Sequence, residues 1–212
     1  MSSSNPTPNA QELVILVHGF FGSRLDMLLL ARRLKKSGFE TFFFTYSSFG
    51  TRIPTIAARL AAKLNQIEND DSIQRVHLVT HSMGGIVARA AFADQVFKKA
   101  SRIVTLTPPN RGSHIAGRLG WLFEWICPSL QQISDHQDSY VNSLGTFLTN
   151  PQVELGIVRS SKDRVIAQDC VMLEGCREMH DVNIHHGMIT WYSEAARLVK
   201  DFLRRGTFKA GS

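Results

Sequence analysis

The sequence predicts an α/β protein with a single domain, a mostly parallel sheet of about six strands and helices on both faces. Two observations favour this fold class. Short apolar, β-branched runs alternate along the chain with segments whose apolar residues recur at helical spacing, which is typical of repeated strand–helix–strand units. The chain has 212 residues, 43% of them hydrophobic, which suits one sizeable core and is too few for two.

The first predicted strand is the run Leu13-Val14-Ile15-Leu16-Val17, whose continuous apolar character indicates a strand covered on both faces. Further strands are expected at residues 40–46, 76–79, 102–107, 156–158 and within 177–184. Helices are expected after the capping pair Ser23 and Asp26, from Pro54, over 86–92, and over about 190–205 with a stop at Gly206. Ligands of such sheets bind beyond the carboxyl ends of the strands, so the loops there should hold the site.

We divide the chain into a flexible lead-in over residues 1–11, an α/β domain over 12–206 and a C-terminal tail over 207–212. Within the domain, residues 110–151 show the least regular pattern and contain a cluster of bulky apolar side chains that includes Trp121 and Trp125. This segment is the least predictable part of the chain.

The charge balance bounds the partners and the compartment. Lys and Arg number 24 against 18 Asp and Glu, a formal net charge of +6, and they are scattered over several helices as on a solvated surface. No dense basic run interleaved with aromatics is present, so nucleic-acid binding is not expected, whereas peripheral contact with an acidic membrane stays an alternative. The lead-in lacks a signal-peptide core, and no run approaches the roughly 20 apolar residues that span a bilayer, so we expect a cytoplasmic protein.

The cysteine and histidine patterns argue against a bound metal. The three cysteines, Cys127, Cys170 and Cys176, are an odd number without the spacing of metal ligands, and they fit free thiols in a reducing compartment. The remaining histidines outside the site loops have no ligand partners at suitable spacing. We therefore expect no metal and no cofactor, and the sequence does not indicate the oligomeric state.

The stretch 76–92 carries the strongest functional signal. A buried strand turns at once into an apolar helix through Thr80-His81-Ser82-Met83-Gly84-Gly85, which is the arrangement of a nucleophile elbow. The tight turn requires small residues two positions either side of the serine, and Thr80 stands where glycine is usual. The alternative interpretation is an ordinary strand–turn–helix in which the Ser82 hydroxyl caps the helix.

A nucleophilic serine needs a base, and the base needs an orienting carboxylate. Asp163 follows the fifth predicted strand, and His185 and His186 both follow the sixth. The chain order serine, aspartate, histidine is the one found with an elbow of this kind. Asp169 and Asp181 are alternative carboxylates at this stage.

Together these motifs resemble the α/β-hydrolases, in particular the minimal lipases of the lipase/esterase branch. The resemblance covers roughly residues 13–203. It depends on the elbow, on the Ser160-Ser161-Lys162-Asp163 loop and the histidine pair, and on two further loops, His18-Gly19 and Thr107-Pro108 with Gly112-Ser113.

The resemblance implies a serine hydrolase that cleaves carboxylic esters, with a hydrophobic or lipid-like acyl substrate, through an acyl-serine intermediate. Ser82 would be the nucleophile, His185 the base and Asp163 its orienting partner. In similar hydrolases two apolar residues stand three and four places after the catalytic histidine; Met188 and Ile189 fit His185, with His186 as the alternative. A thioesterase, amidase or transacylase, or a binding protein without catalysis, are the other functions considered.

The resemblance also assigns the remaining site residues. The oxyanion hole would be formed by the backbone N–H groups of Phe20 and Met83. Residues 110–151 would form a cap or lid, and Phe21, Trp121 and Trp125 would line the substrate pocket or meet a lipid surface. Packing of the two tryptophans into the core is the alternative.

Overall fold

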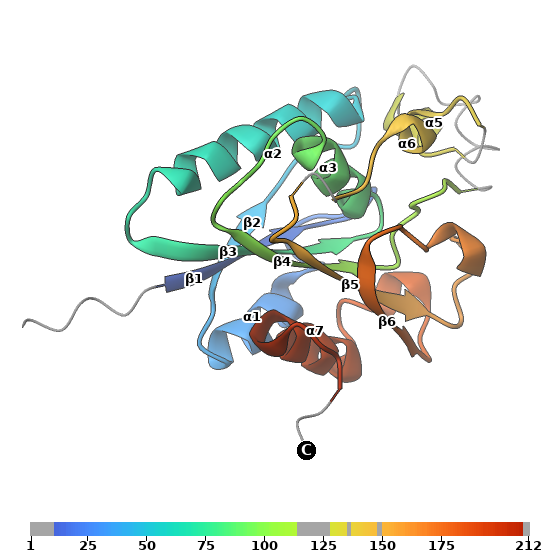
Figure 1. The fold of residues 1–212 in the computed structure, drawn as a ribbon. Coiled ribbons are helices and arrows are strands. Elements are labelled where there is room, and N and C mark those ends of the chain that lie inside the picture. The colour runs from blue at the N-terminus through green and yellow to red at the C-terminus, as the bar shows by residue number, and fades with distance from the viewer. Residues whose placement is uncertain (1–10, 114–127, 135–136, 148–149, 210–212) are drawn as a thin grey trace, which may run out of the picture.

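The structure is a computed structural model that describes residues 11–113, 128–134, 137–147 and 150–209. Its centre is a sheet of six parallel strands in the order β2-β1-β3-β4-β5-β6 (Figure 1). The strands are β1 (Gln11–Val17), β2 (Glu40–Phe44), β3 (Ile73–His81), β4 (Ala100–Leu106), β5 (Glu154–Ser160) and β6 (Cys176–Val182). The predicted fold class is confirmed.

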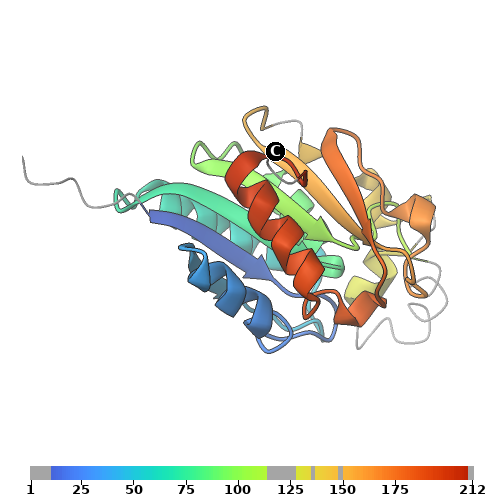
Figure 2. The same cartoon turned by 90° about the horizontal axis from the view of Figure 1, so that it is seen from below.

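Helices cover both faces of the sheet. One face carries α1 (Leu28–Lys36) and α7 (Ser193–Arg205), which lie in front of the strands in Figure 2. The opposite face carries α2 (Ile53–Glu68) and α3 (Met83–Phe92). The shorter elements are α5 (Pro128–Gln132), α6 (Tyr140–Ser143) and the 3-10 turns η2 (Gln168–Cys170) and η3 (His186–Met188).

The two hydrophobic layers explain the continuous apolar run of β1. Val14 and Leu16 are buried in the layer under α1 and α7. Ile15 and Val17 are buried in the layer under α2 and α3. Because successive side chains of a strand point to opposite faces, a strand covered on both sides must be apolar at every position.

Two helices start later than the sequence predicts. The Ser23 N–H donates to Asp26 Oδ2 at 2.5 Å, as in a capping box. This bond and the one from the Asp26 N–H to the Ser23 carbonyl close a turn, and α1 begins only at Leu28. Likewise α7 begins at Ser193 because the preceding residues form η3 and a further turn. Its end is as predicted, since Gly206 adopts the left-handed conformation with φ 72° and its N–H donates to the Phe202 carbonyl.

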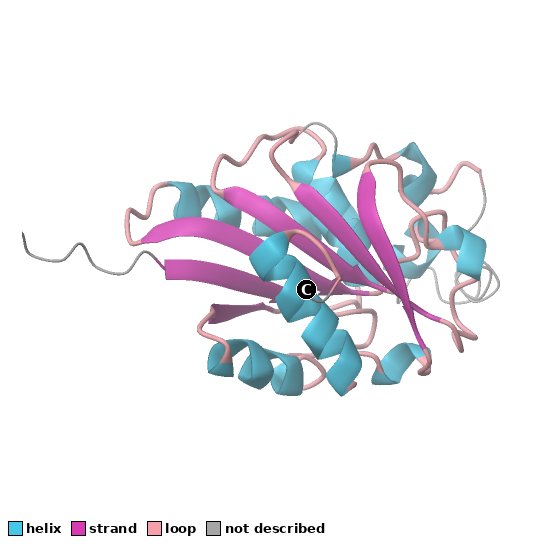
Figure 3. Ribbon diagram, turned by 60° about the horizontal axis from the view of Figure 1, so that its bottom comes forward, coloured by secondary structure: helices cyan, strands magenta, loops and turns pink. Residues whose placement is uncertain are grey.

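The carboxyl ends of all six strands lie at one edge of the sheet (Figure 3). The loops at this edge contain the predicted elbow, the Asp163 loop and the histidine pair. The described part of the 110–151 insertion contributes α5 and α6, whereas Trp121 and Trp125 lie outside the described residues. None of the helices in the described part is both long and apolar enough to cross a membrane.

Candidate active site

Ser82 lies in a strained turn between β3 and α3. Its backbone has φ 51° and ψ −125°. Among the described non-glycine residues, positive φ occurs only at Phe21, Ser82 and Thr107, and each follows the carboxyl end of a strand. Conformations of this kind cost about 1–3 kcal/mol each and persist where the surrounding structure enforces them, which is typical of functional sites.

The elbow is tight on its helix side. A Cβ on Gly84 would lie 2.6 Å from the carbonyl oxygens of both Val17 and His18, so only glycine fits there. A Cβ on Gly85 would lie 3.4 Å from Thr80 Oγ1. That separation is an ordinary contact, so the fully buried Thr80 fits beside the helix and the turn accommodates threonine where glycine is usual.

The Ser82 hydroxyl does not cap α3. Ser82 occupies the N-cap position, yet its side chain makes no capping hydrogen bond. Its backbone N–H donates to the Leu106 carbonyl of β4 at 2.9 Å, which fixes the turn to the sheet. The helix-cap interpretation of Ser82 is therefore wrong for this structure, and the hydroxyl is left for another use.

Asp163 meets the imidazole of His186. Asp163 Oδ2 lies 2.7 Å from His186 Nδ1, and the carboxylate side chain is fully shielded from solvent. Because a carboxylate only accepts, Nδ1 carries the proton and Nε2 is left as the acceptor in the neutral ring. The expected contact of Asp163 with His185 is wrong, and His186 takes its place.

Burial explains why the spacing favoured the wrong histidine. The prediction of His185 depends on an apolar residue three positions later, which is Met188, but Met188 is 45% exposed. Three residues after His186 comes Ile189, which is fully buried beneath α7. The chain is extended at His185 (φ −79°, ψ 153°), and His185 is exposed whereas His186 is half-buried.

The Asp163 carboxylate is held by three donors. Its second oxygen, Oδ1, accepts the N–H groups of Val165 at 2.8 Å and Ile166 at 2.9 Å. Burial by itself would raise the pKa of Asp163, but the hydrogen bond from His186 and these two N–H groups outweigh it and hold the pKa below its usual value. The group is therefore an anion with a fixed orientation.

The two alternative carboxylates have other roles. Asp181 forms a two-pronged ion pair with Arg159, with Nε–Oδ1 and Nη2–Oδ2 distances of 2.7 Å. Asp169 lies in η2 and, within the described part of the chain, makes no ion pair with a histidine. Neither competes with Asp163.

His186 lies beside the Ser82 turn, where it contacts His81, the residue before Ser82. The two rings have centroids 5.1 Å apart, and His81 Nε2 lies 3.2 Å from the His186 carbonyl oxygen. Among the described residues, no hydrogen bond links Ser82 Oγ directly to the His186 ring. Such bonds are often loose without substrate and tighten when the reacting complex forms.

The loop after β1 is held in place by the His18 ring and by Tyr46. His18 Nε2 accepts the Tyr46 N–H at 3.3 Å, so the proton is on Nδ1, which donates to the Gly19 carbonyl at 2.8 Å. Tyr46 stacks on the His18 ring and donates its hydroxyl to the His18 carbonyl at 2.6 Å. Burial lowers the pKa of His18, which keeps the ring neutral.

This loop packs directly on the elbow. A Cβ on Gly19 would lie 3.0 Å from Ser82 Cβ, so the backbone passes the serine at close range. Within the described part of the chain, the N–H groups of Phe20 and Met83 donate to no backbone or side-chain acceptor. Two free N–H groups, one on each side of Ser82, are thus available to a ligand.

An exposed aromatic cluster borders the same loop. Phe21 is 64% exposed and Phe49 is 52% exposed, with ring centroids 5.1 Å apart. Phe20 lies against Phe21 and packs partly into the core. Phe21, predicted to line the substrate pocket, therefore lies in the loop after β1 and faces solvent.

Two site residues were missed by sequence reasoning. Tyr46 supports His18, and only its position just past β2 could have indicated this. Arg89, a polar residue within the apolar pattern of α3, is buried and donates to the carbonyls of Asn110, Leu144 and Gly145. Burial lowers the pKa of Arg89 to about 10, and the cation holds both ends of the 110–151 insertion to α3.

The described residues offer no group of three or more His, Cys, Asp or Glu side chains that could hold a metal ion. The arrangement that they do offer is a strained serine, a buried aspartate–histidine pair and two free N–H groups at one edge of a parallel sheet. This set of groups is suited to acyl transfer.

Solved structures with the same fold are lipases and esterases. The mature form of the Bacillus licheniformis lipase BlEst2 matches with a TM-score of 0.73 and 18% identity over 97% of this chain and 96% of that one. The Pyrococcus furiosus esterase Pf2001 matches with a TM-score of 0.64 and 18% identity over 95% of this chain and 85% of that one. Est1E from Butyrivibrio proteoclasticus matches with a TM-score of 0.63 and 14% identity, over 94% and 88% of the two chains. The fold is that of the α/β-hydrolases.

The family is identified by sequence. Residues 7–114 match the family model described as "Putative serine esterase (DUF676)", and the chain belongs to this family. The matched segment includes the loop after β1 and the Ser82 turn, whereas Asp163 and His186 lie beyond it. A comparison with curated proteins finds no match. At the level of its family, the chain is a serine ester hydrolase.

Proposed function

We propose that the protein hydrolyses carboxylic esters through an acyl-serine intermediate, with Ser82 as nucleophile, His186 as general base and Asp163 as the residue that orients His186. The observation that carries the proposal is the buried Asp163–His186 hydrogen bond beside the strained Ser82 turn. Asp163 fixes the tautomer in which Nε2 is free to accept a proton. His186 replaces His185 in this proposal.

The proposed reaction proceeds in two halves. Ser82 Oγ attacks the ester carbonyl carbon while its proton passes to His186 Nε2. The tetrahedral intermediate then expels the alcohol, which takes that proton. A water molecule, deprotonated by the same imidazole, then attacks the carbonyl carbon of the acyl-serine. The second tetrahedral intermediate expels Ser82 Oγ, which takes the proton back from His186, and the carboxylic acid leaves.

The negative oxygen of each intermediate would be held by the Phe20 and Met83 N–H groups. Both donors lack a partner among the described residues, and both come from segments that pack on Ser82. Met83 also begins α3, whose positive dipole end favours an anion there. Preorganised donors of this kind are worth on the order of 3 kcal/mol each.

The test is a panel of nitrophenyl esters of graded acyl length, together with a fluorophosphonate probe, on the wild type and Ser82→Ala. We expect the wild type to turn over esters and to be labelled at Ser82, and Ser82→Ala to lose both. Ser72→Ala, at an exposed serine in the turn before β3 and so at the opposite edge of the sheet, is the matched control and should behave as wild type. A binding protein without catalysis would leave Ser82 unlabelled and every ester intact.

The same triad also serves thioesterases, amidases and transacylases, so the ester preference is a proposal in its own right. Competition assays with matched ester, thioester and amide substrates of one acyl chain rank these activities. We expect the highest kcat/KM for the ester. A thioester with the higher value, or acyl transfer to an added alcohol that outpaces hydrolysis, would redefine the activity.

A hydrophobic substrate is favoured by the apolar side chains exposed at the carboxyl edge. These side chains are all between 40% and 65% exposed: Phe21, Leu25, Phe49, Val165, Met188 and Trp191. Exposed cations from the same loops, Arg24, Arg52 and Lys162, would suit an anionic lipid surface. We expect salt-sensitive binding to vesicles with anionic lipid and weaker binding to neutral ones; equal binding to both contradicts the electrostatic contact.

Trp121 and Trp125 remain predicted pocket or lid residues. Their truncation to alanine should change the preference for acyl length while the fold, measured by circular dichroism, stays intact. A uniform loss of turnover for short and long esters would show that they do not line the acyl site.

A further inference from the structure

His81 is a buried polar residue that contacts three parts of the site. His81 is the last residue of β3 and directly precedes Ser82. Its ring packs under the oxyanion loop, because a Cβ on Gly19 would lie 3.1 Å from His81 Nδ1. On the other side, Nε2 reaches the backbone carbonyl of His186 at 3.2 Å.

The polarity of this last contact is fixed by chemistry. A carbonyl oxygen only accepts, so the proton of His81 must be on Nε2. Burial, reinforced by the neighbouring His186, lowers the pKa of His81 to about 3, so the ring is neutral and has one N–H. That single donor is directed at the loop that contains His186.

The loop has few other ties at this point. Within the described chain, the Asp163 contact holds the His186 ring from the side of β5, and Ser160 Oγ donates to the Ile184 carbonyl two residues before it. No other side chain among the described residues donates to the His186 backbone. A shift of about 1 Å between reacting groups can lower a rate by roughly 100-fold.

We propose that His81 is a positioning residue, which sets the distance between Ser82 and His186 by donating its Nε2–H to the His186 carbonyl. This inference rests on the proposed function of the site. His81 does not touch the reacting atoms and exchanges no proton; it links the nucleophile turn to the base loop so that both move together.

The experiment compares His81→Gln with His81→Met. Glutamine places an amide N–H near the position of His81 Nε2, whereas methionine has the same length without a donor. We expect His81→Met to lower kcat for a short nitrophenyl ester by roughly 10- to 100-fold with KM nearly unchanged, and His81→Gln to recover most of this loss. Equal losses in the two variants would overturn the proposal.

A second measurement does not depend on turnover. The proton shared by His186 Nδ1 and Asp163 should give a downfield NMR signal, assigned by its loss in Asp163→Asn. We expect the signal to broaden or shift in His81→Met and to persist in His81→Gln; an unchanged signal in His81→Met would also contradict the proposal. If the esterase activity itself were absent, wild type would turn over nothing, but the signal would still report on positioning.

A matched control separates positioning from general damage. His77 is a second buried histidine on β3, and in the described structure neither ring nitrogen has a hydrogen-bond partner. His77→Leu should leave both kcat and the downfield signal as in wild type. If it lowered kcat as much as His81→Met, loss of any buried histidine on β3 would explain the effect and the specific role of His81 would be refuted.

Discussion

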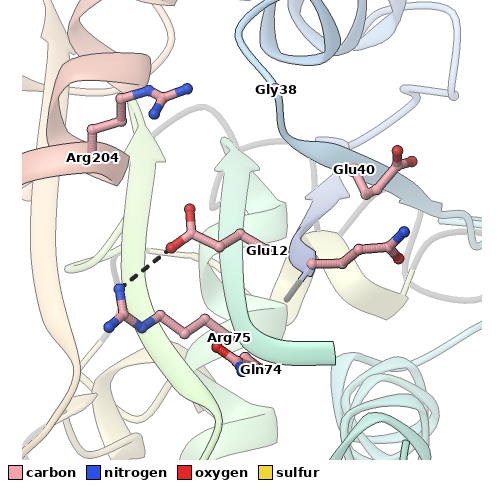
Figure 4. A pocket seen from close by; sticks show the side chains of 7 residues that line it. Glu12, Gly38, Glu40, Gln74, Arg75 and Arg204 are labelled. Atoms are coloured by element: carbon pink, nitrogen blue, oxygen red, sulfur yellow. Dashed lines mark hydrogen bonds and ion pairs between the residues drawn. The ribbon is translucent and has the colours of Figure 1, made fainter. Parts of the chain in front are cut away.

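Both ends of the sheet carry acidic side chains, and these side chains differ in burial and in partners. At the carboxyl edge, Asp163 is fully shielded and satisfied by three donors, and the chain around it adopts strained conformations. At the amino edge, Glu12 and Arg75 form a 3.3 Å ion pair in an open cleft with Glu40 and Arg204 nearby (Figure 4). The Arg75 side chain is 59% exposed there.

The difference indicates which edge of the sheet contains groups that lower the stability of the fold. Strain at Ser82, a desolvated carboxylate and N–H groups without partners each oppose folding, and all are found at one edge. The Glu12–Arg75 pair of the amino-edge cleft stays partly hydrated, at 33% and 59% side-chain exposure, and loses little solvation on folding. A ligand site is expected where a structure holds groups that only a ligand would satisfy, which favours the carboxyl edge over the cleft of Figure 4.

The largest expected effect separates two adjacent histidines at the carboxyl edge. His186→Ala should lower kcat for ester hydrolysis by about 10⁴-fold or more, because it removes the base. His185→Ala should change kcat less than about threefold, because that residue is exposed and the described hydrogen bond of Asp163 goes to His186 instead. Steady-state kinetics on a soluble ester measures both; the reverse ranking would restore His185 as the base.

The next effect applies one chemical change to both edges. Asp163→Asn should lower kcat by about 10³- to 10⁴-fold, because an amide no longer fixes the His186 tautomer that accepts the serine proton. Glu12→Gln, the same change in the amino-edge cleft, should leave kcat within twofold of wild type. Comparable losses in the two variants would mean that the edges do not differ in function.

Sequence patterns predicted the sheet well because each strand is covered by helices and reads as an apolar run. They predicted Ser82 and Asp163 for the same reason, since a motif beside a buried strand is fixed by that strand. They could not separate His185 from His186, because His185 is extended and His186 begins η3, and only tertiary packing shows which of the two adjacent side chains is inside. The exposure of Met188 and the burial of Ile189 decided this, and neither is visible in the residue types.

The same limit applies to Arg89 and His81. A lone arginine on a helix is expected at the surface, and its burial against carbonyls of the 110–151 insertion depends on contacts with Asn110 and Leu144, which lie 21 and 55 positions away. The link from His81 to His186 spans 105 positions. Local propensity contains no information at such separations.

A third prediction concerns a buried histidine that lies away from the site. His77 is fully buried, and desolvation, reinforced by Arg102 and Arg75, lowers its pKa from 6.5 to about 4. Between these values the unfolded chain binds a proton that the folded chain does not, so stability is full above pH 6.5 and falls as the pH drops towards 4. The loss from this residue is roughly 3 kcal/mol.

Urea unfolding at pH 7 and pH 4 measures this loss. Wild type should lose more free energy of unfolding across the interval than His77→Leu, with a difference of roughly 3 kcal/mol. Thr105→Val, at a buried residue of β4 that does not titrate, is the control and should keep the wild-type dependence. The low pKa of His81, about 3, acts in the same direction and remains in every variant. Parallel losses in wild type and His77→Leu would contradict the assignment.

The smallest effect is expected at the amino edge itself. Arg75→Gln removes the cation that pairs with Glu12, but both side chains are partly hydrated, at 59% and 33% exposure. Exposed pairs contribute a median of about 0–1 kcal/mol, so the free energy of unfolding should change by less than about 1 kcal/mol, and added salt should reduce even that. Urea titrations at low and high salt measure it. A loss of about 2 kcal/mol or more would show that the Glu12–Arg75 pair is desolvated and cooperative, and the contrast between this cleft and the carboxyl edge would then no longer identify the site.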